Sequence, residues 1–174
     1  MERYTKTAIL LHWLTALLII AAFTLGLVMT DIPGLTPTKL KYYSWHKWMG
    51  VTVLALAVIR VLWRKANRPP AHVASMTPLQ VKAADAMHYV LYFLIFAVPV
   101  SGYLYTTAAG VPVVYLGLFK IPSLFAADPA LKELLKPVHY WLNMILAAAV
   151  IGHIVAALKH QFIDRDGVLK RMLP

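Results

Sequence analysis

The chain has 174 residues, of which 60% are hydrophobic and 14% are charged, with a formal net charge of +10. A water-soluble domain carries about a quarter charged residues, so this composition excludes a water-soluble enzyme and favours a protein of the lipid bilayer. The chain has no cysteine, which excludes thiolate-bound iron–sulfur clusters, covalently attached c-type haem and cysteine zinc sites.

Four apolar stretches, residues 7–29, 42–63, 84–107 and 138–158, are long enough to cross a membrane. A span needs about 20 residues for a hydrocarbon core of about 30 Å. The stretches show no alternation of apolar and polar residues, which indicates helices rather than a barrel. We therefore predict an all-α fold, a transmembrane four-helix bundle that forms one integral membrane domain over residues 1–174 and is surrounded by lipid.

The basic residues predict the orientation of this bundle. Of the 17 Lys and Arg residues, eleven fall at the two termini and in the connection after the second stretch, and six fall on the other side. The side richer in Lys and Arg is cytoplasmic by the positive-inside rule, so both termini are expected in the cytoplasm. In a bacterium, the protein would then lie in the inner membrane with the opposite side facing the periplasm. Bases placed between apolar runs also argue against nucleic acid as a partner.

The outer connections are residues 31–40 and 108–137. The longer one contains four prolines, but its middle, residues 113–119, is apolar. This run is too short to cross the membrane, so we expect an interfacial segment that lies over the bundle.

Histidines carry the predicted chemistry, because ionisable side chains within a span are costly and mark functional sites. His139 and His153 are 14 residues apart, which places them within about 40° of one helix face and about 21 Å apart along it. His12 is level with His153, and His46 is level with His139. The sequence thus predicts two histidine pairs, one near each membrane surface. The outer pair is His46 with His139, and the inner, cytoplasmic pair is His12 with His153.

Two histidines from facing helices can hold the iron of a haem b without any cysteine. A zinc site would normally take four ligands close together, which pairs at separate depths do not provide. We therefore predict two haems b as cofactors, with His12, His46, His139 and His153 as the iron ligands.

Several other residues are candidates for contacts with the cofactors. Gly26 and Gly102 lie at the depth of the outer site and Gly50 one turn after His46, where they either leave room for a porphyrin or only permit close helix packing. Arg60 either pairs with haem propionates or anchors the inner end of its helix.

The remaining histidines also leave alternatives open. His88 shares a helix face with Asp85, and the two either relay protons or hydrogen-bond together. His72 is expected to be solvated in a polar loop. His160 lies seven residues after His153, on the same helix face and about 10 Å nearer the cytoplasm. There it either binds a quinone head group or is an ordinary interfacial histidine.

Four motifs make the chain similar to the small bacterial cytochrome b561 proteins, which are related to the cytochrome b subunits of membrane hydrogenases and formate dehydrogenases. The motifs are Leu11-His12-Trp13-Leu14, Ser44-Trp45-His46-Lys47, the third-stretch segment from His88-Tyr89 to Ser101-Gly102, and His139 with His153. The resemblance implies axial ligation by the same four histidines and electron exchange with membrane quinone. For members that act alone, it implies oxidation of superoxide at the periplasmic face.

Two functions follow from these observations. The first is a superoxide:ubiquinone oxidoreductase, in which outer lysines attract the small anionic donor. The second is a haem-bearing anchor subunit that docks a redox partner protein, such as a hydrogenase or dehydrogenase, and forwards its electrons to quinone.

Overall fold

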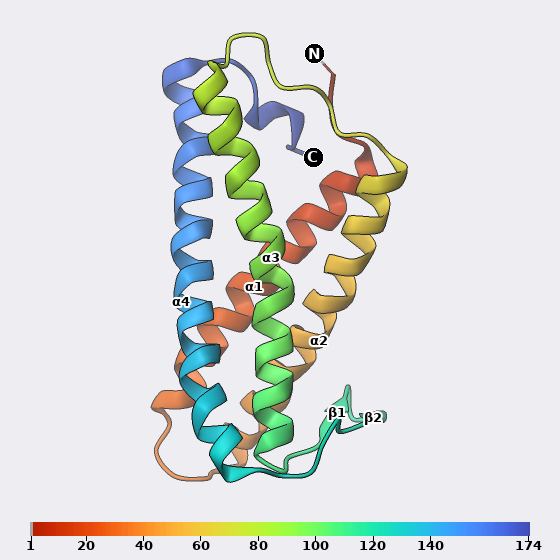
Figure 1. Ribbon diagram of the computed structural model, residues 1–174, viewed down its shortest axis with the longest axis vertical. Helices are drawn as coiled ribbons and strands as arrows, with labels where there is room; N and C mark the ends of the chain where they lie inside the picture. The colour runs from red at the N-terminus through yellow and green to blue at the C-terminus, as the bar shows by residue number, and fades with distance from the viewer. Residues whose placement is uncertain (1) are drawn as a thin grey trace.

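Four long helices run through the computed structural model, which describes residues 2–174 (Figure 1). They are α1 (Lys6–Asp31), α2 (Pro37–Ala66), α3 (Pro78–Ala108) and α4 (Pro129–Lys159). By length and composition, α1, α3 and the continuous helical run Pro129–Asp164 are able to cross a membrane. Helix α2 is long enough, but it carries six basic residues, so its crossing stays a prediction.

The helices begin earlier than the apolar stretches because each one has a polar N-cap. The side chains of Thr5, Thr36, Thr77 and Asp128 accept hydrogen bonds from amides of the first turns. Proline follows the cap in α2, α3 and α4, where its missing N–H costs no helical bond.

The predicted outer connection of residues 108–137 is therefore too long. It ends at Asp128, and Pro137 lies inside α4. The Asp128 carboxylate accepts hydrogen bonds from the amides of Ala130 and Leu131, which starts the helix well before Pro137. Prolines inside membrane helices are tolerated where neighbouring groups compensate for the lost bond.

The apolar middle of this connection forms a β-hairpin rather than part of an all-α fold. Strands β1 (Val113–Tyr115) and β2 (Phe119–Ile121) pair antiparallel, with Val114 opposite Lys120. Leu116 and Gly117 turn the chain with φ values of 52° and 74°. The hairpin lies at the end of the molecule opposite both termini (Figure 1).

Side chains of α2 fasten this hairpin to the bundle. The Trp48 indole donates to the Val114 carbonyl at 2.6 Å, and the hydroxyls of Thr52 and Tyr115 are 2.9 Å apart. The connection thus lies over one end of α2, which fits the expected position of an interfacial segment but not its expected conformation.

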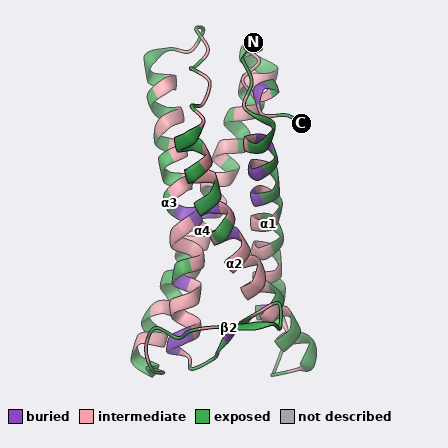
Figure 2. Ribbon diagram, turned by 90° about the vertical axis from the view of Figure 1, so that its right-hand side faces the viewer, coloured by how far each residue is buried: buried purple, intermediate pink, exposed green. Residues whose placement is uncertain are grey.

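The helices pack as α1 with α2, α3 with α4, and α2 with α3. At mid-length, Ala57, Leu94, Ile95 and Leu146 form a buried apolar cluster. Leu146 is seven residues from both His139 and His153. Buried positions elsewhere are scattered along the inner faces of the helices (Figure 2). An apolar layer therefore separates the two histidine levels.

The tail after α4 folds back to the amino terminus at the other end of the bundle (Figure 1). It contains a turn of π-helix, η1 (His160–Asp164), and a 3-10 turn, η2 (Leu169–Arg171). The buried Arg171 guanidinium donates to the carbonyls of Glu2 and Ala71, each at 2.8 Å. One arginine thus ties together the tail, the amino terminus and the α2–α3 connection.

Candidate functional site

The structure brings the predicted histidines together in two pairs. The ring centroids of His46 on α2 and His139 on α4 are 6.3 Å apart, and those of His12 on α1 and His153 on α4 are 6.2 Å apart. All four side chains are half-buried. A metal bonded at about 2 Å to one nitrogen of each ring separates the ring centres by about 6 Å, so both pairs fit a bis-imidazole iron site.

Hydrogen bonds orient His46 for this role. Its Nδ1 lies 2.9 Å from the carbonyl oxygen of Ala22, one helix away. A carbonyl only accepts, so Nδ1 carries the proton and Nε2 keeps its lone pair. Metal-binding histidines are commonly held in this tautomer by a backbone carbonyl.

His139 reaches the same tautomer through Ser101. The Ser101 hydroxyl donates to the Val98 carbonyl at 2.8 Å, and its oxygen lies 3.0 Å from His139 Nδ1. Because the only hydroxyl proton is used, Nδ1–H is the donor in the second bond. Nε2 then accepts from the Asn143 amide at 3.2 Å, and this amide also donates to the His139 carbonyl at 2.7 Å, so a metal at Nε2 would replace the first of these bonds.

Glycines receive the imidazoles of the outer pair. A Cβ on Gly102 of α3 would lie 2.8 Å from His139 Cε1, and a Cβ on Gly26 of α1 would lie 3.3 Å from His46 Cε1. Because each glycine has no side chain, the histidine ring of the neighbouring helix can approach the backbone of the glycine's helix. Gly50 differs, because nothing in the described residues lies within 4 Å of the position its Cβ would take.

The inner pair is surrounded by cationic and aromatic groups. An Arg60 guanidinium nitrogen lies 3.3 Å from His12 Nδ1, and the guanidinium of Arg60 lies over the Tyr92 ring at 5.7 Å. Arg64 approaches the same ring at 5.8 Å. Arginine cannot accept a hydrogen bond, so His12 Nδ1 is the acceptor here and its proton lies on Nε2.

The predicted partnership of Asp85 with His88 is wrong. Asp85 pairs instead with His72, at 3.1 Å between Oδ1 and Nε2, so His72 is not merely solvated. The His88 ring lies 5.7 Å from that of His153. Asp85 and His88 are three residues apart on one helix, but the Asp85 carboxylate hydrogen-bonds to the neighbouring loop and the His88 ring lies beside a histidine of the neighbouring helix.

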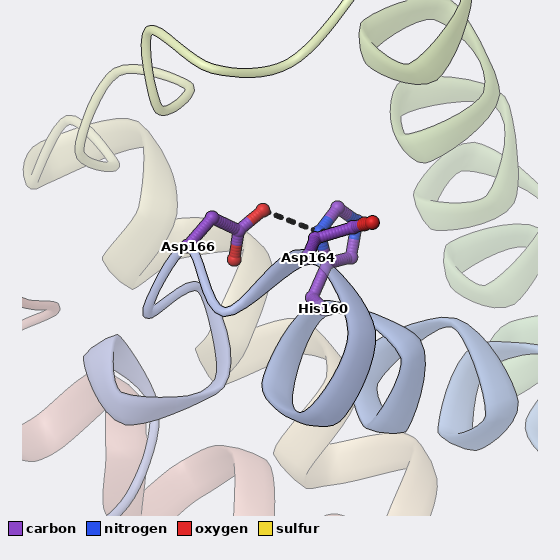
Figure 3. A group of neighbouring side chains, drawn as sticks. All are labelled: His160, Asp164 and Asp166. Carbon is purple, nitrogen blue, oxygen red and sulfur yellow. Dashed lines mark hydrogen bonds and ion pairs between the residues drawn. The ribbon is translucent and has the colours of Figure 1, made fainter.

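His160 forms a cluster with two carboxylates at the end of α4 (Figure 3). Its Nδ1 lies 2.6 Å from Asp166 Oδ2 and 3.3 Å from Asp164 Oδ2. The carboxylates therefore fix the ring through Nδ1 and leave Nε2 for another partner.

Lysines lie around the outer pair. Lys47, next to His46, donates to the Pro112 carbonyl at 3.4 Å, and the Lys41 ammonium lies 4.7 Å from the centre of the Trp45 ring. Lys39 donates to the Ile32 carbonyl at 2.6 Å, and Lys120 is exposed on β2. No carboxylate within residues 2–174 forms an ion pair with these four lysines.

Long apolar helices with facing histidine pairs define a class of protein: a helical membrane protein whose donor set suits haem b. Comparison with known proteins gives the same class, because the family described as "Prokaryotic cytochrome b561" matches residues 3–174. The chain belongs to the prokaryotic cytochrome b561 family. Membership implies haem b binding, electron transfer in a membrane and oxidoreductase activity.

Curated relatives cover almost the whole chain. "Cytochrome b561 homolog 2" of Escherichia coli (strain K12) is 38% identical over 172 residues, covering 99% of this chain and 92% of the relative. "Cytochrome b561 homolog 1" of the same strain is 31% identical, covering 100% of this chain and 98% of the relative. "Probable superoxide oxidase CybB" of Yersinia pestis is 29% identical, covering 99% and 97%.

Some groups around the histidines were missed by the sequence reasoning. The Ala22 carbonyl carries no side-chain pattern and needed the helix packing to be found. Asn143 stands one turn after His139, the spacing that brings side chains together on a helix, so it was detectable. Ser101 falls in the third-stretch motif, but its role depends on how α3 meets α4.

Substituting the three glycines should give a graded response. Gly102→Ala should displace the His139 ring and change the absorbance and spin state of bound haem, because its Cβ would overlap Cε1. Gly26→Ala should have a smaller effect and Gly50→Ala almost none. Optical and electron paramagnetic resonance spectra of the purified proteins measure this order. Equal effects of the Gly50 and Gly102 substitutions would contradict it.

Proposed function

We propose that this chain is a membrane oxidoreductase that holds two haems b and transfers electrons from superoxide, on the periplasmic side, to ubiquinone, on the cytoplasmic side. It would act as a single domain of the bacterial inner membrane with four spanning helices and both termini in the cytoplasm. The observation that carries this proposal is the presence of two histidine pairs at opposite ends of the bundle, at 6.2 and 6.3 Å.

Each pair would hold one cofactor. His46 and His139 would supply Nε2 lone pairs at the outer level, with the Asn143 amide giving up its bond to His139 Nε2, and His12 and His153 would act at the inner level. Bound haem would supply one-electron redox chemistry at both levels. The layer around Leu146 separates the two levels with apolar side chains.

Arg60 has a specific part at the inner level. His12 can bind iron through Nε2 only when its proton moves to Nδ1, and a protonated Nδ1 no longer accepts from Arg60. The guanidinium is then free to turn to carboxylates such as the haem propionates, for which its paired N–H groups are suited.

The outer lysines favour a small anionic donor. Lys39, Lys41, Lys47 and Lys120 form no ion pair with a carboxylate in the described chain, so their positive field extends to solvent near His46. Such a field raises the encounter rate of an anion. The name of the Yersinia pestis relative supports superoxide as that anion.

The overall reaction balances with a two-electron acceptor. Two superoxide anions each lose one electron and leave as dioxygen, while ubiquinone gains two electrons and two protons to become ubiquinol. His160 lies at the cytoplasmic end of α4 with Nδ1 fixed by Asp166. When the ring carries a proton on both nitrogens, its Nε2–H is available to donate a hydrogen bond to a quinone carbonyl and to supply the proton.

The first test concerns the cofactors. The purified chain should contain two non-covalent haems b with six-coordinate, low-spin iron, measured by acidic acetone extraction and a pyridine haemochrome assay. His12→Ala or His153→Ala should change the spin state of one haem, and His46→Ala or His139→Ala that of the other. One haem per chain, or His12 and His139 acting on the same haem, would overturn the stacked pairs.

The second test concerns the donor. Pulse radiolysis should show rapid reduction of the oxidised protein by superoxide. Neutralising Lys39, Lys41, Lys47 and Lys120 together should slow this step by roughly tenfold and weaken its dependence on ionic strength, because exposed charges act over about 8–10 Å.

The matched control neutralises four cations at the opposite end, Lys6, Lys65, Arg68 and Lys82, and should leave the rate unchanged. If the unmodified protein does not react with superoxide, the donor is instead a docked redox protein.

The third test concerns the acceptor. His160→Ala should slow reoxidation by an added ubiquinone analogue in stopped-flow experiments, while both haem spectra and the reduction step stay nearly intact. His72→Ala, which removes a histidine paired with Asp85 at the same end, is the control. An unchanged reoxidation rate in the His160 variant would move the quinone site elsewhere, with the outer haem as the next candidate.

A further inference from the structure

A polar hollow of about 290 Å³ lies directly beyond the end of the last spanning helix. It is lined by Gln161, Arg165, Gly167 and Lys170. Two residues with left-handed backbone, Arg165 at φ 51° and Gly167 at φ 77°, end the helix and turn the chain around the hollow. The hollow is thus formed by the turn between η1 and η2, outside the histidine pairs.

The two cations of the hollow have no acidic partner. Asp164 accepts from Lys159 at 2.5 and 2.8 Å, and Asp166 is bound to His160 at 2.6 Å (Figure 3). Arg165 uses only its Nε, which donates to the Phe162 carbonyl at 3.3 Å. Among residues 2–174, Arg165 and Lys170 form no ion pair. The hollow is therefore positively charged and suited to an anion.

The depth of the hollow points to the lipid head groups. Residues 161–165 follow the apolar stretch that ends at residue 158 by three to seven positions, which is roughly 5–10 Å of helix. The head-group layer occupies about 5–8 Å on each side of the hydrocarbon core. Phe162 and Ile163, between the lining residues, are 67% and 74% exposed. Apolar side chains thus adjoin the two cations, as a lipid with a charged head and acyl chains requires.

We propose that this hollow binds the phosphate of an anionic phospholipid, with Arg165 and Lys170 on the phosphate and with Phe162 and Ile163 against its acyl chains. Arginine binds phosphate oxygens through paired N–H groups, lysine binds them as a point charge, and the Gln161 amide adds donors. Free inorganic phosphate carries the same kind of negative charge, but it has no acyl chains to contact the exposed side chains of Phe162 and Ile163.

The test measures lipid binding by the purified full-length chain with native mass spectrometry. Phosphatidylglycerol should bind the unmodified protein, and phosphatidylcholine at equal concentration should not. Arg165→Asn with Lys170→Gln should weaken phosphatidylglycerol binding by roughly 25-fold, taking about fivefold for each cation near a membrane surface. Asparagine is chosen because it tolerates the left-handed backbone of Arg165.

The control Arg68→Gln with Lys82→Gln removes the same charges at the same end, outside the hollow, and should bind the lipid as the unmodified protein does. Equal weakening by the control, or equal binding of phosphatidylcholine, would overturn the site. Lys170→Gln alone, at an exposed position, should give about a fivefold loss and replaces the double variant if that variant fails to fold.

A second comparison separates lipid from free phosphate. Phe162→Ser with Ile163→Ser should weaken phosphatidylglycerol binding but leave the binding of inorganic phosphate, measured by calorimetry, unchanged. If inorganic phosphate and phosphatidylglycerol bind the unmodified protein equally well, and neither binding changes in this variant, the hollow recognises the phosphate group alone and the lipid proposal is overturned. These measurements involve no electron transfer, so their outcome is independent of the proposed redox function.

Discussion

The constraint on which the rest of the structure depends is that imidazoles inside an apolar bundle must have defined partners. A polar ring without a hydrogen bond is costly where water is excluded. In the outer pair, Ala22 and Ser101 accept the Nδ1 protons of His46 and His139. These bonds fix both rings in one tautomer and leave the Nε2 of each ring unprotonated. The same interactions that make the rings tolerable also leave each ring a nitrogen that is suited to bind a metal.

The two helical hairpins of the bundle, α1 with α2 and α3 with α4, pack a glycine against a histidine in the same way at the outer level. In the first, Gly26 of α1 faces His46 of α2, and in the second, Gly102 of α3 faces His139 of α4. A glycine on one helix thus admits the histidine of its partner, so each hairpin presents an imidazole to the other. At the inner level Arg60 and His88 flank the pair instead, so a guanidinium and a third imidazole lie beside it.

Tryptophans beside the paired histidines connect each histidine level to a covering segment. Trp48, two residues after His46, donates to the hairpin at Val114, and Trp13, next to His12, donates to the tail at Met172 at 2.8 Å. The indole of an interfacial tryptophan has an apolar body and one donor, so it can remain in the bundle while bonding to a segment outside it. The covering segments are therefore placed with respect to the histidines themselves.

The sequence by itself determined the membrane class, the four long helices and which histidines share a level, because apolar length and the 3.6-residue period are local properties of the chain. It placed His139 and His153 on one face of α4 and matched His46 and His12 to them by depth. Only the tertiary structure decided that Asp85 pairs with His72 rather than His88, that residues 113–121 form a hairpin, and that Ser101 and Ala22 hold the outer rings. The side-chain partners arise where separate helices and loops meet, and contacts between distant segments leave no periodic trace in the sequence. The hairpin is local, but its strands have only three residues each, too few for an alternating pattern to indicate them.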